Sequence, residues 1–433
     1  MWIVFISTLA FIFILVHISV KDYTYRAFYY LMLVGFTIYS GVGILTEYEN
    51  IRQNAYLYML QFFLFIFAFF AGSHLVVKYR VHYYMKSLDR IALYKCISVL
   101  GMIYIFTFVY RCIFSGVSLE DLLNIQELFV NYNATDFATR VVRRNDVIYT
   151  IVTNQIASVT APFYFIMLYN NRKKHIKFLI LYLFPILLEL LADGYLSRNK
   201  IAVYLVFIYL YLVQEKIISI RLAKVFAIIG IPIFLFMFAV LANVRLGINE
   251  GNGFWASIRD LILSEVGYPQ YYDYCVAKGE DISLLNFLLY IITICIPSQI
   301  TNIFNISTPN LAYSLTEAVT GLSYAQTNNY YILLPSVLGE ALMLFGKYFA
   351  FLYGAIYGVI STWFLKILKG HKCLKYFMIY YLLDFFRQFR GGSQYVISAW
   401  ETRIIPMIII VAGIVCFTKR GDRSNGINHN SNI

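Results

Sequence analysis

The chain alternates between long apolar runs and short polar segments. Most runs approach the roughly 20 apolar residues that a helix needs to cross the hydrocarbon core of a bilayer. The pattern therefore predicts an all-α polytopic membrane protein with about eleven transmembrane helices. The runs cover residues 1–20, 27–45, 55–77, 91–114, 147–169, 178–196, 200–214, 225–244, 344–366, 374–389 and 396–417.

Lysine and arginine clusters predict which loops face the cytoplasm. Short cytoplasmic loops carry an excess of these residues, and the clusters occur in alternate connections between the predicted helices. The N-terminus is then expected outside and the C-terminus inside. The clusters lie within 78–90, 172–177, 216–224, 366–375 and 419–423.

One transmembrane domain is expected over residues 1–420, followed by a disordered cytoplasmic tail over 421–433. Two large outer loops are predicted, at about 115–146 and 245–335. Each contains apolar residues at helical spacing, which predicts interfacial helices; helices packed on the protein's own loops are the alternative. A short apolar run at 284–297 is interpreted as re-entrant or interfacial.

Composition excludes a soluble enzyme. The chain is 60% hydrophobic and only 13% charged, whereas a soluble domain needs roughly 25% charged residues. The net charge of +12 arises largely from the loops predicted to be cytoplasmic, so nucleic acid is not an expected partner. The cysteines and histidines lack metal-site spacing, and no histidine falls in a predicted outer loop. No metal or cofactor is therefore expected.

The basic residues predicted outside are nearly all arginines. A guanidinium group is planar and binds phosphate through two parallel hydrogen bonds. Several converging arginines would suit a lipid diphosphate at the outer leaflet; the alternative is that each reaches the interface or pairs with an acid. The set is Arg111, Arg140, Arg143, Arg144, Arg198, Lys200, Arg245, Arg259, Arg387, Arg390 and Arg403.

Acidic residues also lie in or beside the apolar runs. An intramembrane carboxylate is a functional candidate by default, as a proton relay or a general base, and structural pairing is the alternative. These acids are Glu189, Asp193, Glu340, Asp384 and Glu401. On the predicted helix 344–366, Gly354 and Gly358 form a small-residue pair that predicts close helix approach.

Three segments resemble a known family. Residues 333–360, LLPSVLGEALMLFGKYFAFLYGAIYGVI, resemble the C-terminal "GE…FG…G…G" region of oligosaccharide repeat-unit polymerases, the Wzy-type O-antigen or capsule polymerases. Residues 193–198 (DGYLSR) and 387–393 (RQFRGGS) are similar to the family's mid-chain and late outer turns. The arrangement of about eleven apolar runs with one large late outer loop also resembles that of this polymerase family.

The resemblance implies a fold and a reaction. The fold would be GT-C-like. A growing glycan would move from undecaprenyl pyrophosphate onto the next lipid-linked repeat unit, at the periplasmic face of a bacterial inner membrane and without a cofactor. The expected partners are that lipid-linked oligosaccharide, the bilayer and a chain-length regulator protein. The alternatives are a lipid-linked oligosaccharide flippase or other transporter, another GT-C glycosyltransferase, or an O-antigen ligase, which relies on an outer-loop histidine.

Specific residues are expected to carry this chemistry. Glu340 or Asp193 is the candidate general base. The candidate diphosphate-binding residues are Arg198, Arg245, Arg387 and Arg390, with Arg143 and Arg144 as second choices. Tyr324, Tyr330 and Tyr331 are expected to stack on sugar rings.

Overall fold

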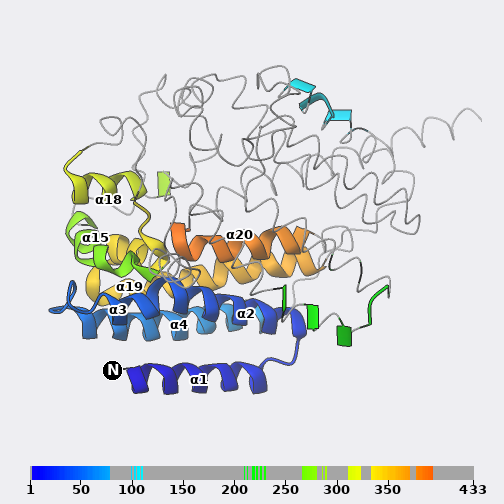
Figure 1. Cartoon of the computed structure of the whole chain (residues 1–433), viewed down its shortest axis with the longest axis horizontal. Coiled ribbons are helices and arrows are strands. Elements are labelled where there is room, and N and C mark those ends of the chain that lie inside the picture. The colour runs from blue at the N-terminus through cyan, green and yellow to red at the C-terminus, as the bar shows by residue number, and fades with distance from the viewer. Residues whose placement is uncertain are drawn as a thin grey trace, which may run out of the picture. The chain divides into compact units, whose positions relative to one another are not determined.

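A computed structural model describes the chain at residues 2–78, 266–279, 311–322, 333–370 and 377–393, and at isolated positions within 99–110, 209–230 and 285–289. Within these residues the structure is helical, with no strand (Figure 1). The chain divides into two compact units, Met1–Met85 with Ile262–Ala399, and Lys86–Leu261 with Trp400–Ile433. The helices described below belong to the first unit. The single transmembrane domain expected over 1–420 stays a prediction.

Four described helices are long and apolar enough to cross a membrane. They are α1 (Trp2–Ser19), the continuous helix Tyr23–Thr46, α4 (Ala55–Lys78) and α19 (Ser336–Gly370). The helix Tyr23–Thr46 comprises α2 (Tyr23–Phe36), the π-helix η1 (Thr37–Val42) and α3 (Gly43–Thr46). These helices confirm the helical prediction for four of the apolar runs.

A fifth helix, α20 (Phe377–Gly391), falls where residues 374–389 predict one. It packs against both α19 and α2, and α19 in turn packs along α4 (Figure 1). The other predicted spans lie outside the continuously described residues, as do the predicted interfacial helices and most of the short run at 284–297.

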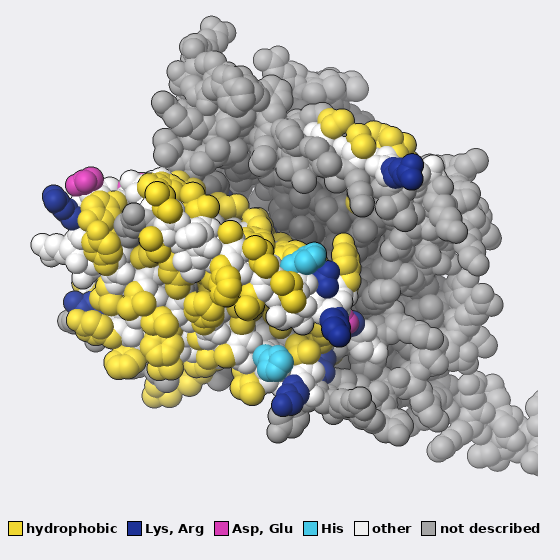
Figure 2. Space-filling view, turned by 90° about the horizontal axis from the view of Figure 1, so that it is seen from below, with side chains coloured by type: hydrophobic (Ala, Val, Ile, Leu, Met, Phe, Trp, Pro, Cys, Tyr) yellow, Lys and Arg dark blue, Asp and Glu magenta, His cyan; other side chains and the backbone are white. Residues whose placement is uncertain are grey.

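The outward surface of these helices is apolar. On α19, Phe349, Leu352, Ile356, Ile360 and Trp363 recur three or four residues apart and are all exposed. The large apolar side chains of α1 are exposed over most of its length. Figure 2 shows a face on which hydrophobic side chains predominate, with Lys and Arg toward its margins. A continuous apolar surface of this kind is suited to contact with the hydrocarbon of a bilayer and is unfavourable in water.

Glycines bring α4 and α19 into close contact. A β-carbon would lie 2.7 Å from the Phe65 carbonyl oxygen at Gly354, and 2.2 Å from that of Phe69 at Gly358. From the other side, a β-carbon at Gly72 would lie 2.3 Å from the carbonyl oxygen of Ala355. The close approach predicted from Gly354 and Gly358 is confirmed, and α4 is the partner helix.

Stacked aromatic rings fill the space between α2, α4 and α20. Phe36 stacks on Phe62 and Phe65, with ring centroids 4.8 and 4.6 Å apart, and Phe28 lies 4.4 Å from Phe385. All five rings are fully buried. Such ring pairs contribute about 0.5–1.5 kcal/mol beyond the burial of their area.

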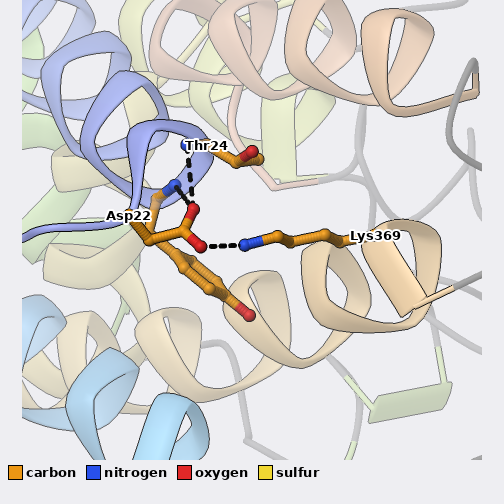
Figure 3. Close-up of polar contacts among 4 residues, drawn as sticks. Asp22, Thr24 and Lys369 are labelled. Carbon is orange, nitrogen blue, oxygen red and sulfur yellow. Dashed lines mark hydrogen bonds and ion pairs between the residues drawn. The ribbon is translucent and has the colours of Figure 1, made fainter.

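Polar contacts join α2, α4 and α19 at one end of this bundle. Asp22 caps α2 by accepting hydrogen bonds from the backbone N–H groups of Thr24 and Tyr25, and its second oxygen pairs with Lys369 (Figure 3). Burial of Asp22 raises its carboxyl pKa, but the hydrogen bonds from Lys369 and the backbone outweigh it and lower the pKa overall. Lys366 donates to the carbonyl oxygen of Val76 near the end of α4. We call this end of the bundle, with Asp22, Lys366 and Lys369, the lysine end.

Helix α19 is broken at Gly346, where φ is 69° and ψ is 176°. Gln61 of α4 bonds to the backbone just after the break: its Nε2 donates to the Tyr348 carbonyl oxygen at 2.9 Å, and its Oε1 accepts from the Phe351 N–H at 3.1 Å. The helix begins at Ser336, eight residues before the predicted start at 344. The predicted run 344–366 corresponds to the part of α19 that follows the break, and residues 336–343 were not predicted; they are buried inside the protein and so fall outside a pattern set by contact with lipid.

Candidate functional site

The candidate site lies at the opposite end of the bundle from the lysine end. There the start of α19 contacts the end of α20, and three short helices from the predicted outer loop 245–335 gather at the same end, two of them against α19 and the third against one of these two. The three short helices are the 3-10 helix η3 (Tyr268–Tyr271), α15 (Tyr272–Gly279) and α18 (Leu311–Thr320) (Figure 1). The sequence had not predicted these three helices individually, and the apolar pattern on which an interfacial helix was expected in this loop lies almost wholly outside the described residues.

Glu340 is the central residue of the site. It lies in the first half of α19 and is 1% exposed. Its Oε2 accepts a hydrogen bond from the backbone N–H of Ser393 at 2.5 Å, and its Oε1 accepts one from the Ser393 hydroxyl at 2.7 Å. Burying a carboxyl group is costly unless its oxygens are hydrogen-bonded. Ser393 supplies a donor to each oxygen.

The end of α20 is shaped to present Ser393. Gly392 adopts a left-handed φ of 87°, and its N–H bonds to the Gln388 carbonyl oxygen at 2.7 Å. This is a left-handed helix cap, which leaves the next N–H, that of Ser393, available to another acceptor. A β-carbon at Gly392 would also lie 2.9 Å from Oε2 of Glu340. Position 392 therefore requires glycine for two reasons: the left-handed backbone conformation, and the lack of room for a β-carbon beside Glu340.

Two predicted diphosphate-binding residues stand near the end of α20: Arg390 lies in its last turn, and Arg387 lies just before that turn. Arg387 and Arg390 are three residues apart and so lie on neighbouring positions of the helix surface. Arg387 is half-buried and Arg390 is exposed. The Nε of Arg390 donates to the hydroxyl of Tyr268 in η3 at 2.6 Å. We call residues 387–393 the arginine turn.

Helix η3 is itself held in place by a close backbone contact. A β-carbon at Gly43 would lie 2.0 Å from the Val266 carbonyl oxygen and 2.5 Å from the Pro269 ring. The Tyr268 ring lies 6.1 Å from that of Tyr39 in η1. Tyr268 therefore reaches Arg390 from a segment that is docked on the helix Tyr23–Thr46.

A second polar group fixes α15 and the start of α19. Asp273 accepts hydrogen bonds from the side-chain amide of Asn54, at 2.8 Å, and from the hydroxyl of Tyr58. The Tyr272 hydroxyl bonds to that of Ser336 at 3.2 Å, and the Ser336 hydroxyl accepts from the Gly339 N–H at 3.3 Å. Burial raises the pKa of both Tyr272 and Cys275, so each stays neutral.

Three of the predicted site residues, Glu340, Arg387 and Arg390, fall among the described residues, and the structure brings them to one end of the bundle. Ser393 and Tyr268 were not predicted as site residues. Ser393 is only the last residue of the segment 387–393, which resembles the polymerase family. Residues outside the described part of the chain are Asp193, Arg198, Arg245, Arg143, Arg144, Tyr324, Tyr330 and Tyr331. The described residues hold no group of three or more His, Cys, Asp or Glu that could bind a metal ion.

The described residues define a class: a helical protein with several helices able to cross a membrane. No protein-family model, curated protein or solved structure matches the chain. Any more specific function therefore has to be argued from the chemistry of the site. The described part of the site holds a buried carboxyl group, that of Glu340, bonded to Ser393, and two arginines that precede Ser393 in sequence near the end of α20.

Proposed function

We propose that the chain is a membrane glycosyltransferase that polymerises lipid-linked oligosaccharide repeat units at the periplasmic face of a bacterial inner membrane. One observation carries the proposal. The contact between Glu340 and Ser393 joins two of the segments that resemble Wzy-type polymerases, 333–360 and 387–393, at one end of an apolar bundle. Those segments are far apart in sequence, and their shared site includes two arginines suited to a diphosphate.

The reaction suits such a site. A hydroxyl of the incoming repeat unit attacks the anomeric carbon of the growing glycan, and the bond from that carbon to the diphosphate oxygen breaks. Undecaprenyl pyrophosphate leaves, and the hydroxyl proton passes to a carboxylate. The donor is already activated, so the protein has to position the reactants and stabilise the departing charge, for which no cofactor is required.

Residue roles follow from this chemistry. Arg387 and Arg390 would bind the diphosphate. The sequence assigns the same role to Arg198 and Arg245, with Arg143 and Arg144 as second choices. The proton acceptor would be Glu340 or Asp193. Sugar stacking is assigned to Tyr324, Tyr330 and Tyr331.

A lipid-linked oligosaccharide flippase is the second candidate function. It is favoured by the break at Gly346 within α19, close in sequence to the buried Glu340. Broken membrane helices commonly form the substrate sites of transporters. The two candidates differ in their product: a polymerase makes longer glycans, whereas a flippase only moves its substrate across the bilayer.

The deciding experiment uses purified protein in liposomes that contain a polyprenyl-diphosphate-linked repeat unit. We expect a ladder of glycans that differ by one repeat unit, together with release of free polyprenyl diphosphate. A matched sample with Arg387→Lys should give a ladder reduced by at least about tenfold, because a lysine cannot form the two parallel bonds. Movement of the substrate between leaflets without any elongation would replace the polymerase by the flippase.

A further inference from the structure

The buried carboxyl group of Glu340 is poorly placed to act as a general base. A general base has to reach the proton that it removes, directly or through one water molecule. Glu340 is 1% exposed, and each of its oxygens already accepts a hydrogen bond from Ser393. Its hydrogen bonds are those of a structural side chain that fixes the position of another part of the chain.

The segment that it holds is the arginine turn. Ser393 follows directly after the cap of α20, so its two hydrogen bonds fix where that helix ends relative to α19. Gly392 sits against Oε2 with no room for a side chain. Arg390 lies two residues before Gly392, and Arg387 lies one helical turn further back. The direction of both guanidinium groups therefore depends on this anchor.

A second anchor acts on Arg390 itself. The Tyr268 hydroxyl accepts a hydrogen bond from Nε, and this sets the plane of the guanidinium group. Bidentate recognition of a phosphate depends on that plane. Catalytic groups have to be held within about 0.5 Å of their productive position, and this is done by the residues around them.

We infer that Glu340 and Tyr268 are positioning residues: together they hold the arginine turn so that Arg387 and Arg390 face the diphosphate of a polyprenyl lipid. The inference rests on the proposed function for the identity of that ligand. It removes Glu340 from the role of proton acceptor and leaves that role to another carboxylate, of which Asp193 is the candidate.

The test compares three variants with matched controls. Glu340→Gln keeps the shape of the side chain and removes its charge and one acceptor oxygen. Ser393→Ala removes the hydroxyl donor and keeps the backbone N–H, and Tyr268→Phe removes only the hydroxyl that binds Arg390. The controls are Ser73→Ala and Tyr381→Phe, which each remove a buried hydroxyl with one or more hydrogen bonds elsewhere in the same bundle.

The first measurement is binding of undecaprenyl diphosphate to the protein in nanodiscs, which does not require catalysis. We expect each of the three variants to weaken binding by about tenfold, the effect of losing one good hydrogen bond to a charged group, and the controls to bind normally. Hydrogen exchange supplies a second measurement: the 387–393 amides should exchange faster in Glu340→Gln and Ser393→Ala than in either control. Normal binding together with unchanged exchange would overturn the inference.

The kinetics then separate positioning from base catalysis. For a positioning role, Glu340→Gln should raise KM for the lipid-linked donor and leave the pH profile of kcat unchanged. A fall in kcat of about 10²–10⁴-fold, with loss of one limb of that profile and unchanged binding, would restore Glu340 as the base. If the wild-type protein binds the diphosphate lipid but makes no polymer, the proposed polymerase fails while the positioning role stands.

Discussion

At the scale of single residues, Gly392 shows how one position meets two demands. Its φ of 87° belongs to the left-handed region, which L-residues with a side chain adopt at a cost of roughly 1–2 kcal/mol. The missing β-carbon also admits Oε2 of Glu340 at close range. A substitution here should therefore disturb both the cap of α20 and the anchor of the arginine turn.

A comparison of two glycines separates these effects. Gly321 has a φ of 71° and has no atom near the place of its β-carbon, so Gly321→Ala reports backbone strain alone. Gly392→Ala adds a contact with Glu340 at 2.9 Å. We expect Gly392→Ala to lower the thermal unfolding temperature in detergent more than Gly321→Ala does, and to reduce polymer formation at least about tenfold. Equal effects of the two changes would mean that the Glu340 contact contributes nothing.

At the scale of elements, α19 is two helices with different surroundings. Residues 336–343 are buried on all sides, whereas residues 347–370 bury one face against α4 and expose the other. Gln61, 2% exposed in the middle of α4, satisfies backbone groups just after the break. A polar side chain inside an apolar helix is thus explained by the backbone of its neighbour, since unpaired backbone groups in a membrane are costly.

The contact between α4 and α19 gives the prediction at this scale. A β-carbon at Gly358 would lie 2.2 Å from the carbonyl oxygen of Phe69, so the two helices would have to separate. We expect Gly358→Ala to cost about 1–3 kcal/mol of stability, as overpacking of a core does. Thermal unfolding in detergent measures this, with Ile360→Ala on the exposed face of α19 as the control. If Gly358→Ala lowered the thermal unfolding temperature no more than Ile360→Ala does, the close packing of α4 and α19 would be contradicted.

The sequence predicted the helices that face lipid and missed the features that depend on contacts inside the protein. The runs at 1–20, 27–45 and 55–77 correspond to α1, the helix Tyr23–Thr46 and α4, because contact with lipid selects apolar residues over a known length. The run at 344–366 corresponds to the part of α19 after the break, whereas the helical residues 336–343 were missed because they contact protein instead of lipid. The break at Gly346 follows from a backbone conformation that apolar periodicity does not encode.

In the candidate site too, the sequence predicted some residues and missed those that depend on contacts inside the protein. Glu340, Arg387 and Arg390 were predicted because a charged residue in or beside an apolar run is conspicuous. Ser393 and Tyr268 were missed because each acts through a partner distant in sequence: Ser393 through Glu340, and Tyr268 through Arg390. Serine and tyrosine are common in such a chain, and a sequence alone does not pair them.

At the scale of the whole molecule, the first unit has two chemically different ends. The lysine end gathers Lys366 and Lys369, two of the residues that predict a cytoplasmic face, with Asp22 beside them. The other end carries the turn at 47–54, the helices of the predicted outer loop and the candidate site. Because helix ends that lie together face the same side of a bilayer, the sidedness of all these segments is linked.

That link makes the orientation testable with two single cysteines. In a background with the native cysteines replaced, Glu49→Cys would place a thiol at an exposed position of the turn at 47–54, and Lys21→Cys one at an exposed position of the lysine end. With the N-terminus outside, a membrane-impermeant maleimide added to spheroplasts should label position 49 and spare position 21 until the membrane is opened. The reverse pattern would put the arginine turn in the cytoplasm. A polymerase that takes its substrate from the outer leaflet could not work from there, so this one measurement constrains both the topology and the proposed reaction.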